Sequence, residues 1–282
     1  MKEIIYYTTK IDRKQFVEKI LNLFKDQIKN KVFVKPNQVS YEEFPTTTHP
    51  ETLEAVFKYL QDKGCEIICG DGQGVDVSNK KVENTTIKQI CEKYGIEFKN
   101  LYKSPMKKYK TPRGVSIKMS TLPFEVDSII SLPNLKSHPH WELHMTGALK
   151  MVVGYFSKID RIKMHMHAFF PFMRSRWKII AEANWLLMKQ ESLPLYLTIM
   201  DATEPLIHAN ELRHGGKPVK LEPGYLLASK CPVVLDIFGF ELLKKVEPRY
   251  KDKTIDYVPY IKWAVEYGLG GPEFELNEVK IN

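Results

Sequence analysis

The sequence predicts an α/β protein with a mainly parallel sheet, helices on both faces and room for two lobes around a cleft. Segments typical of strands alternate with segments typical of helices through the first half of the chain, and this alternation indicates parallel strands joined by helices. The continuous apolar run SIISL at 128–132 fits a strand that is covered on both faces. The 282 residues, 43% of them apolar, suffice for a single α/β domain over 1–282, with a lobe division near residues 120–130.

The predicted strands are short runs of apolar and β-branched residues that end at turns or at charged side chains. In chain order they are Glu3–Thr8, Val32–Val34, Cys65–Cys69, Ser128–Leu132, Leu195–Met200 and Tyr225–Ser229. Residues four apart on a strand point to the same side, so we expect Cys65 and Cys69 both to lie in a core.

The predicted helices carry apolar residues at the spacing of one buried face. Asp12 begins the first helix as its N-cap, and Gln15 completes a capping box. Pro50 and Glu51 suit the first turn of the second helix, which Gly64 ends. The first three helices cover 12–24, 48–64 and 87–95, and four more cover Trp141–Phe156, Pro171–Lys189, Val233–Leu243 and Tyr257–Tyr267.

The composition is that of an ordinary globular protein, and it excludes several classes of protein. No apolar run approaches the roughly 18–20 residues that a membrane span needs. The amino terminus, MKEIIYYTTKIDRKQ, has no apolar signal core, so we expect a soluble, cytoplasmic protein. The four cysteines are too few and too irregularly spaced for a disulfide framework, which agrees with a reducing compartment.

Much of the formal charge of +8 lies in one basic stretch, from Lys99 to Lys118. It holds seven Lys or Arg residues and no Asp or Glu, while Pro105, Pro112 and Gly114 oppose a helix. A solvated loop is one interpretation; a flap that gathers anions over a site and a nucleic-acid patch are two others. Because no nucleic-acid-binding motif accompanies the stretch, nucleic acid is the weakest of the three.

Several polar residues directly follow predicted strands. They are Lys35, Asp71, the segment Pro133–His144 and Asp201. Because the carboxyl ends of parallel strands open at one edge of a sheet, we expect these residues to share a site. Asp71 belongs to the glycine-rich segment Gly70-Asp71-Gly72-Gln73-Gly74, which fits either a tight turn with positive φ or a nest that binds an anion.

Five of the eight histidines lie within 30 residues, in the groups SHPHWELH (His138, His140, His144) and MHMH (His165, His167). A helix beginning at Trp141 would put His140 and His144 one turn apart, and an extended MHMH would put His165 and His167 on one face. His140, His144, His165 and His167 are therefore candidate ligands for a divalent transition metal such as zinc, nickel or iron. Proton transfer near neutral pH is a second role for these groups, and surface or capping histidines without shared geometry are the third interpretation.

Lys136 and Lys150 flank the first histidine group. Lys150 closes the segment Thr146–Lys150 in apolar surroundings, where partial burial lowers the pKa of an amine and makes it a base or a nucleophile. The alternative is a side chain that extends to solvent. The candidate anion-binding residues are Lys35, Gly70, Asp71, Gly72, Lys136 and Thr146.

Six segments occur in the order of an uncharacterised bacterial and archaeal family, catalogued as domain of unknown function 362. They are KPN (35–37), TTHPETLEAV (47–56), GDGQG (70–74), IISLPNLKSH (129–138), TGALKMVVG (146–154) and Lys163–His167. The sequence resembles that family over most of its length. Many relatives append a ferredoxin-like run of cysteines; this chain has none, so we expect no iron–sulfur cluster in it. The family has a histidine about six residues before the TGALK block, where His138 and His140 lie eight and six residues before Thr146.

The spacing is also similar to that of the lactate racemase family, which carries a nickel-pincer nucleotide. In that family a histidine precedes, by ten residues, a lysine that holds the cofactor, and another histidine follows. Here His140 and Lys150 are ten residues apart, and His165 and His167 follow Lys150 by 15 and 17 residues. The resemblance selects these residues for testing.

The sequence thus predicts an enzyme acting on a small anionic substrate, a carboxylate or a phosphate ester. Lys136 and Lys150 would hold the anion or a cofactor, and His138 or His140, with His165 or His167, would transfer protons. The catalytic candidates are His138, His140, Lys150, His165 and His167. A non-catalytic carrier or electron-transfer partner that handles a metal or cluster is the second hypothesis, and a nucleic-acid binder is the third. We expect Lys150 and at least one of His138 and His140 to face the same cleft as Asp71.

Overall fold

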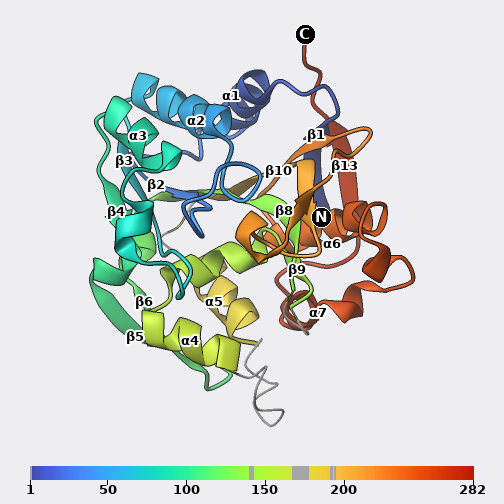
Figure 1. The fold of residues 1–282 in the computed structure, drawn as a ribbon. Helices are drawn as coiled ribbons and strands as arrows, with labels where there is room; N and C mark the ends of the chain where they lie inside the picture. Colours follow the sequence, from blue (N-terminus) through green and yellow to red (C-terminus); the bar gives the residue numbers. More distant parts are fainter. Residues whose placement is uncertain (1, 140–142, 167–177, 191–192, 194) are drawn as a thin grey trace.

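The computed structural model describes residues 2–139, 143–166, 178–190, 193 and 195–282. The main strands are β1 (Glu3–Thr8), β2 (Lys31–Pro36), β3 (Glu66–Asp71), β4 (Phe98–Asn100), β7 (Ser128–Leu132), β10 (Leu195–Ile207), β12 (Tyr225–Ser229) and β13 (Phe274–Glu278). They form one sheet in the order β13-β1-β12-β10-β7-β2-β3-β4 (Figure 1). The strands from β10 to β4 in this order are parallel, whereas β12 is antiparallel to β1 and β10. The expected mainly parallel sheet is confirmed.

Helices cover both faces of this sheet, as the sequence predicts (Figure 1). The helices α1 (Arg13–Leu23), α2 (Pro50–Asp62) and α3 (Thr86–Lys93) pack on one face, and α5 (Lys178–Met188), α6 (Pro232–Lys244) and α7 (Pro259–Glu266) pack on the other. Side chains of β2 point alternately to the two faces of the sheet, so this strand contributes to both cores. Val32 and Val34 join the core under α1 and α2, while Phe33 joins the core that contains α5 and α6.

Local signals determine where the first two helices begin. The backbone N–H of Gln15 donates to Asp12 Oδ1 at 2.9 Å, and Gln15 Nε2 donates to Asp12 Oδ2 at 2.6 Å, which confirms the capping box. Pro50 is the first residue of α2, and His49 Nδ1 accepts the backbone N–H of Glu51 at 3.2 Å.

The expectation of a single helix over Trp141–Phe156 is wrong in its described part. The segment contains strand β9 (Met145–Thr146), which pairs with β8 (Asn134–Ser137), and the 3-10 helix η4 (Leu149–Tyr155). The cause is a tertiary contact, since the Asp236 carboxylate accepts the backbone N–H groups of Ala148 and Leu149 at 2.6 and 3.0 Å. These bonds fix a turn where the sequence pattern alone suggests a continuous helix.

Strand β10 continues to Ile207, well past Asp201, where the sequence suggests its end. A charged residue is tolerated inside this strand because Arg13 Nε lies 2.8 Å from Asp201 Oδ2. The longer strand moves the following loop, including Asn210, to the edge of the sheet where β8 pairs with β10.

The part of the basic stretch from Met106 on is a hairpin, which corrects the interpretation of the stretch as a solvated loop. Strand β5 (Met106–Lys110) pairs antiparallel with β6 (Ser116–Ser120). Ile117 and Met119 are buried in the core, while the three lysines of β5 are exposed. Apolar residues on alternate positions therefore attach the hairpin to the domain and leave its charges in solvent.

The helix predicted over Pro171–Lys189 is confirmed as α5 in its described part, and residues 171–177 lie outside the described ranges. Within those ranges, no helix is both long and apolar enough to cross a membrane. All four cysteines are described and carry free thiols. Cys69 is buried as expected, but Cys65 is only half-buried.

Candidate anion-binding site

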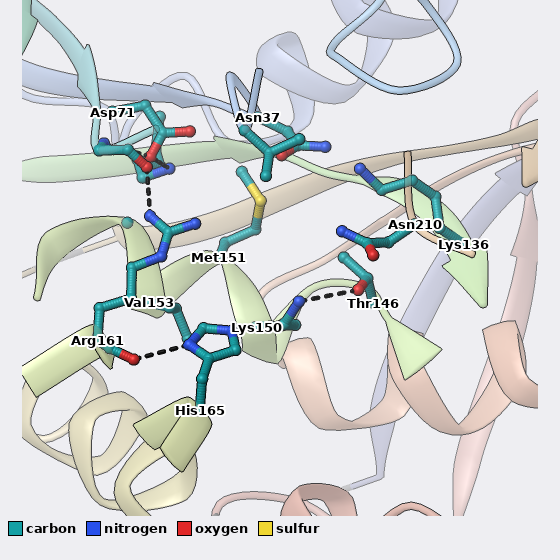
Figure 2. Close-up of a pocket in the computed structure, with 14 residues that line it drawn as sticks. Asn37, Asp71, Lys136, Thr146, Lys150, Met151, Val153, Arg161, His165 and Asn210 are labelled. Carbon is teal, nitrogen blue, oxygen red and sulfur yellow. Dashed lines mark hydrogen bonds and ion pairs between the residues drawn. The ribbon is translucent and has the colours of Figure 1, made fainter. Parts of the chain in front are cut away.

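Two adjoining cavities lie at the edge of the sheet where β2 and β3 end. The inner cavity, of about 40 Å³, is lined by residues of β2, β3, β8, β9, η4 and the helix α4 (Lys158–Met166) (Figure 2). The outer cavity has a volume of about 320 Å³. Val39, Lys150, Arg161, His165 and Asn210 line both cavities and so connect them.

Lys35 and Asp71 form a buried ion pair in the wall of the inner cavity. Lys35 Nζ lies 2.6 Å from Asp71 Oδ1, and the two side chains are 1% and 5% exposed. Asp71 also accepts the backbone N–H groups of Gln38 and Gly72, both at 2.7 Å. Burial lowers the pKa of Lys35, and the attraction of Asp71 opposes that shift. Gly154 leaves room for the pair, since a Cβ there would lie 2.1 Å from Asp71 Oδ1.

Lys136 is fully buried and has a neutral partner. Its Nζ donates to the carbonyl oxygen of Thr46 at 2.7 Å. Burial lowers the pKa of Lys136 to about 8, although the charges of Glu211, Asp71 and Glu42 oppose the shift. Lys136 therefore brings to the inner cavity an ammonium group that is costly to keep charged.

Lys150 lies at the junction of the two cavities. Its Nζ donates to Thr146 Oγ1 at 3.2 Å (Figure 2). Burial is the main cause that lowers the pKa of Lys150 well below its ordinary range, and the positive charges of Arg161 and Lys136 add to it. Of the two alternatives left by the sequence, the structure places this half-buried amine in the cavity wall.

Arg161 is a cation of this site that the sequence alone does not indicate. Its Nη1 donates to the carbonyl oxygen of Gly72 and, at 3.1 Å, to the hydroxyl of Tyr102. The side chain is only 8% exposed, and its Nε has no hydrogen-bond partner in the described part of the chain. No local pattern distinguishes Arg161 from the other basic residues of α4.

His165 faces both cavities from the last turn of α4. Its Nδ1 lies 2.7 Å from the carbonyl oxygen of Arg161, and Figure 2 shows the ring between Arg161 and Lys150. A carbonyl oxygen only accepts, so Nδ1 carries the proton, and Nε2 of the neutral ring is the basic nitrogen. His165 lies in a helix, so the extended conformation considered for MHMH does not hold there, and His167 lies outside the described residues.

The outer cavity adds His138 and a group of paired charges. Arg213 Nε lies 2.7 Å from Glu211 Oε2, and Arg213 Nη2 lies 2.8 Å from Asp76 Oδ2. His138 follows β8 and lines this cavity together with Lys150. Glu211 and Asp76 are thus already engaged with a cation.

Lys150 connects the residues that we expect to share a cleft. It lines the inner cavity with Asp71 and Thr146, and the outer cavity with His138. His140, the other histidine of that expectation, lies outside the described residues.

Other candidates lie elsewhere. Gly70 is a residue of β3 that packs against β4, where a Cβ would lie 2.4 Å from the carbonyl oxygen of Lys99. Neither Gly70 nor Gly72 has a positive φ, so the first of the two interpretations of this segment, a tight turn with positive φ, is wrong there. Asp201 pairs with Arg13 and lines neither cavity.

The structure does not bring the candidate metal ligands together among the residues it describes. The ring of His144 stacks on Tyr257, with centroids 3.7 Å apart, and lines neither cavity. Burial lowers the pKa of His144 to about 4. In the described ranges, no three His, Cys, Asp or Glu side chains form a group that could hold a metal ion. His140 and His167 lie outside those ranges.

Asp236 of α6 supports the helix η4 that carries Lys150. It is fully buried, and burial raises its pKa to about 7 although it accepts two backbone N–H groups. Gly147 permits the close approach, since a Cβ there would lie 2.1 Å from Asp236 Oδ1. The position of Lys150 therefore depends on a contact between η4 and α6.

Comparisons with known proteins identify a family and similar solved structures. The sequence model of a family described as "Domain of unknown function (DUF362)" matches residues 32–241. No curated protein matches the sequence. A crystal structure of a protein from Thermotoga maritima is similar with a TM-score of 0.51 and 16% identity, over 92% of this chain and 60% of that one.

The apoprotein of lactate racemase from Thermoanaerobacterium thermosaccharolyticum is similar with a TM-score of 0.47 and 14% identity, over 87% of this chain and 58% of that one. The chain thus spans about three fifths of the length of both solved proteins. At these identities the likeness to the Thermotoga protein concerns the fold alone.

Proposed function

The chain belongs to the DUF362 family, whose description names no reaction. From the geometry of its own site, we propose that the protein is an enzyme that binds a small organic anion and transfers protons to and from it. Lys136, Lys150 and Arg161 hold a carboxylate or phosphate group in the inner cavity, and the rest of the ligand occupies the outer cavity. Lys150 and His165 are the acid–base groups.

The observation that carries this proposal is a set of three basic side chains without a carboxylate partner. Lys136, Lys150 and Arg161 line one cavity, and none of them forms an ion pair with the described residues. Burying the unpaired charges of Lys136 and Arg161 costs roughly several kcal/mol per ion, even after relaxation. A bound anion offsets that cost, and Asp71 does not, because Lys35 already neutralises it.

The sizes of the cavities support a small ligand. A water needs roughly 10–15 Å³, so the inner cavity of about 40 Å³ suits one charged group of a few atoms. The outer cavity of about 320 Å³ lies near the lower end of the range for small-molecule sites, about 300–1,000 Å³. The basic Nε2 of His165 at the junction suits proton transfer next to the bound anionic group.

A thermal-shift screen with small carboxylates and phosphate monoesters tests the binding. We expect at least one anion to stabilise the wild type, by about 2.7 kcal/mol at a hundredfold excess over its Kd. Lys136→Met and Lys150→Met should lose that shift, and Lys108→Met, which removes an exposed charge from β5, should keep it. Equal shifts in all four proteins, or no shift with any anion, contradict the proposal.

Proton exchange distinguishes an enzyme from a binding protein. We expect the wild type in D₂O to exchange a carbon-bound hydrogen of the bound anion for deuterium, as measured by proton NMR. His165→Gln should slow the exchange and leave the Kd of the anion within a few-fold. Binding without exchange for every anion would show a carrier and refute the acid–base role.

A further inference from the structure

Lys150 differs from the other amines of the site in its access to the outer cavity. It lines both cavities, whereas Lys35 and Lys136 line the inner cavity alone. Its Nζ donates to the hydroxyl of Thr146, and it forms no ion pair with a carboxylate of the described residues (Figure 2). A ligand held by its anionic group in the inner cavity therefore places its next atoms beside this amine.

The charged groups around Lys150 favour its neutral form. Arg161 of α4 and Lys136 of β8 oppose a proton on Nζ, burial acts in the same direction, and Glu211 attracts a proton more weakly. An ordinary lysine at neutral pH has on the order of one amine in a thousand unprotonated. A desolvated lysine next to other cations has many more, which activates it as a nucleophile.

We propose that Lys150 forms an imine with an oxo acid, a small carboxylate that also carries an aldehyde or ketone carbonyl. This rests on the proposed function, because the carboxylate of the oxo acid is the anion that Lys136 and Arg161 hold. The oxo group follows the carboxylate directly or after one carbon, so its carbon lies near Nζ.

The step needs no oxidant or reductant. The lone pair of Lys150 Nζ forms a bond to the carbonyl carbon, and the carbonyl π electrons move to the oxygen, which takes a proton. Loss of water then breaks the carbon–oxygen bond and leaves a carbon–nitrogen double bond. The two amine hydrogens leave with the oxygen, so one amine and one carbonyl give one imine and one water. His165, which lines both cavities beside Lys150, accepts and returns a proton in these transfers.

Reductive trapping of the full-length protein tests the imine. Glyoxylate, pyruvate and 2-oxobutyrate are the probes, sodium cyanoborohydride reduces an imine to a stable secondary amine, and peptide mass spectrometry measures the label on each lysine. We expect at least one probe to label Lys150 faster than the exposed Lys108, on the order of tenfold or more. Propionate has the carboxylate but no carbonyl, so it should slow labelling of Lys150 and leave Lys108 unaffected.

Two variants complete the test. Lys150→Arg has a long basic side chain but no primary amine and should lose the adduct, with circular dichroism as the check on its fold. Lys108→Arg should keep the adduct on Lys150. If none of the three probes labels Lys150 faster than Lys108, the proposal that Lys150 forms an imine is refuted. This comparison needs only the wild-type protein. If anions nevertheless bind with the dependence on Lys136 described above, the proposed function stands; if no anion binds, both fail.

Discussion

Replacing Lys136 by Met should make the protein more stable, although it removes a buried hydrogen bond. Burial lowers the pKa of Lys136 from 10.5 to about 8, so at pH 7 the folded chain carries this ammonium at a cost of roughly 3 kcal/mol. The lost bond to Thr46 is worth about 1–2 kcal/mol, and the Thr46 carbonyl keeps Asn37 Nδ2 as a donor at 3.1 Å. We therefore expect the free energy of unfolding to rise by about 1–2 kcal/mol.

Urea unfolding at pH 7 measures this difference, and Lys108→Met is the matched control at an exposed position, expected to change stability by less than about 0.5 kcal/mol. The pH dependence has a definite sign. Between about pH 8 and 10.5 the unfolded chain keeps the Lys136 proton that the folded chain has lost, so the wild type gains stability as pH rises. The advantage of the variant should shrink over that interval. A Lys136→Met protein less stable than the wild type at pH 7 would refute the reasoning, because the ammonium would then have compensating contacts.

Three further changes test other contacts of the site. Asp71→Asn leaves Lys35 buried without an anionic partner and should lower the free energy of unfolding in urea by about 3–5 kcal/mol. The double variant Asp71→Asn, Lys35→Met should recover part of that loss, whereas additive losses would show that the two residues are not coupled. Gly154→Ala puts a methyl group against the same pair and should cost about 1–3 kcal/mol in thermal unfolding, and wild-type stability would show that the backbone has room. Burial raises the pKa of Asp236 to about 7, so between about pH 4 and 7 the unfolded chain has released this proton while the folded chain still holds it. As the pH rises through that interval, the free energy of unfolding of the wild type should therefore fall by up to about 4 kcal/mol relative to that of Asp236→Asn. Parallel stability profiles of the two proteins would contradict that assignment.

Local patterns in the sequence predict the sheet and the first helices well. Strands β7 and β12 have the predicted bounds because each is a short apolar run with clear ends. The capping box at Asp12 and the proline at Pro50 mark helix starts that the structure contains. The rule that parallel strands open at one edge places Lys35 and Asp71 in one wall, and they form an ion pair there.

The rest of the site depends on contacts between distant segments, which a local pattern cannot reveal. Arg161 binds the carbonyl of Gly72, 89 residues away, and only the packing of α4 brings the two together. The turn before Lys150 exists because Asp236, 88 residues after Ala148, accepts its N–H group. The apolar residues of Trp141–Phe156 have helical spacing, but that spacing carries no information about the Asp236 carboxylate that accepts the N–H group.

A crystal structure of the wild type with the tightest-binding anion from the screen tests the site most directly. We predict that the carboxylate or phosphate oxygens lie within about 2.7–3.2 Å of Lys136 Nζ, Lys150 Nζ and the Arg161 guanidinium, with the remainder of the ligand in the outer cavity. Density for the anion at the exposed lysines of β5 and β6, with water alone in the inner cavity, would contradict the assignment of the site.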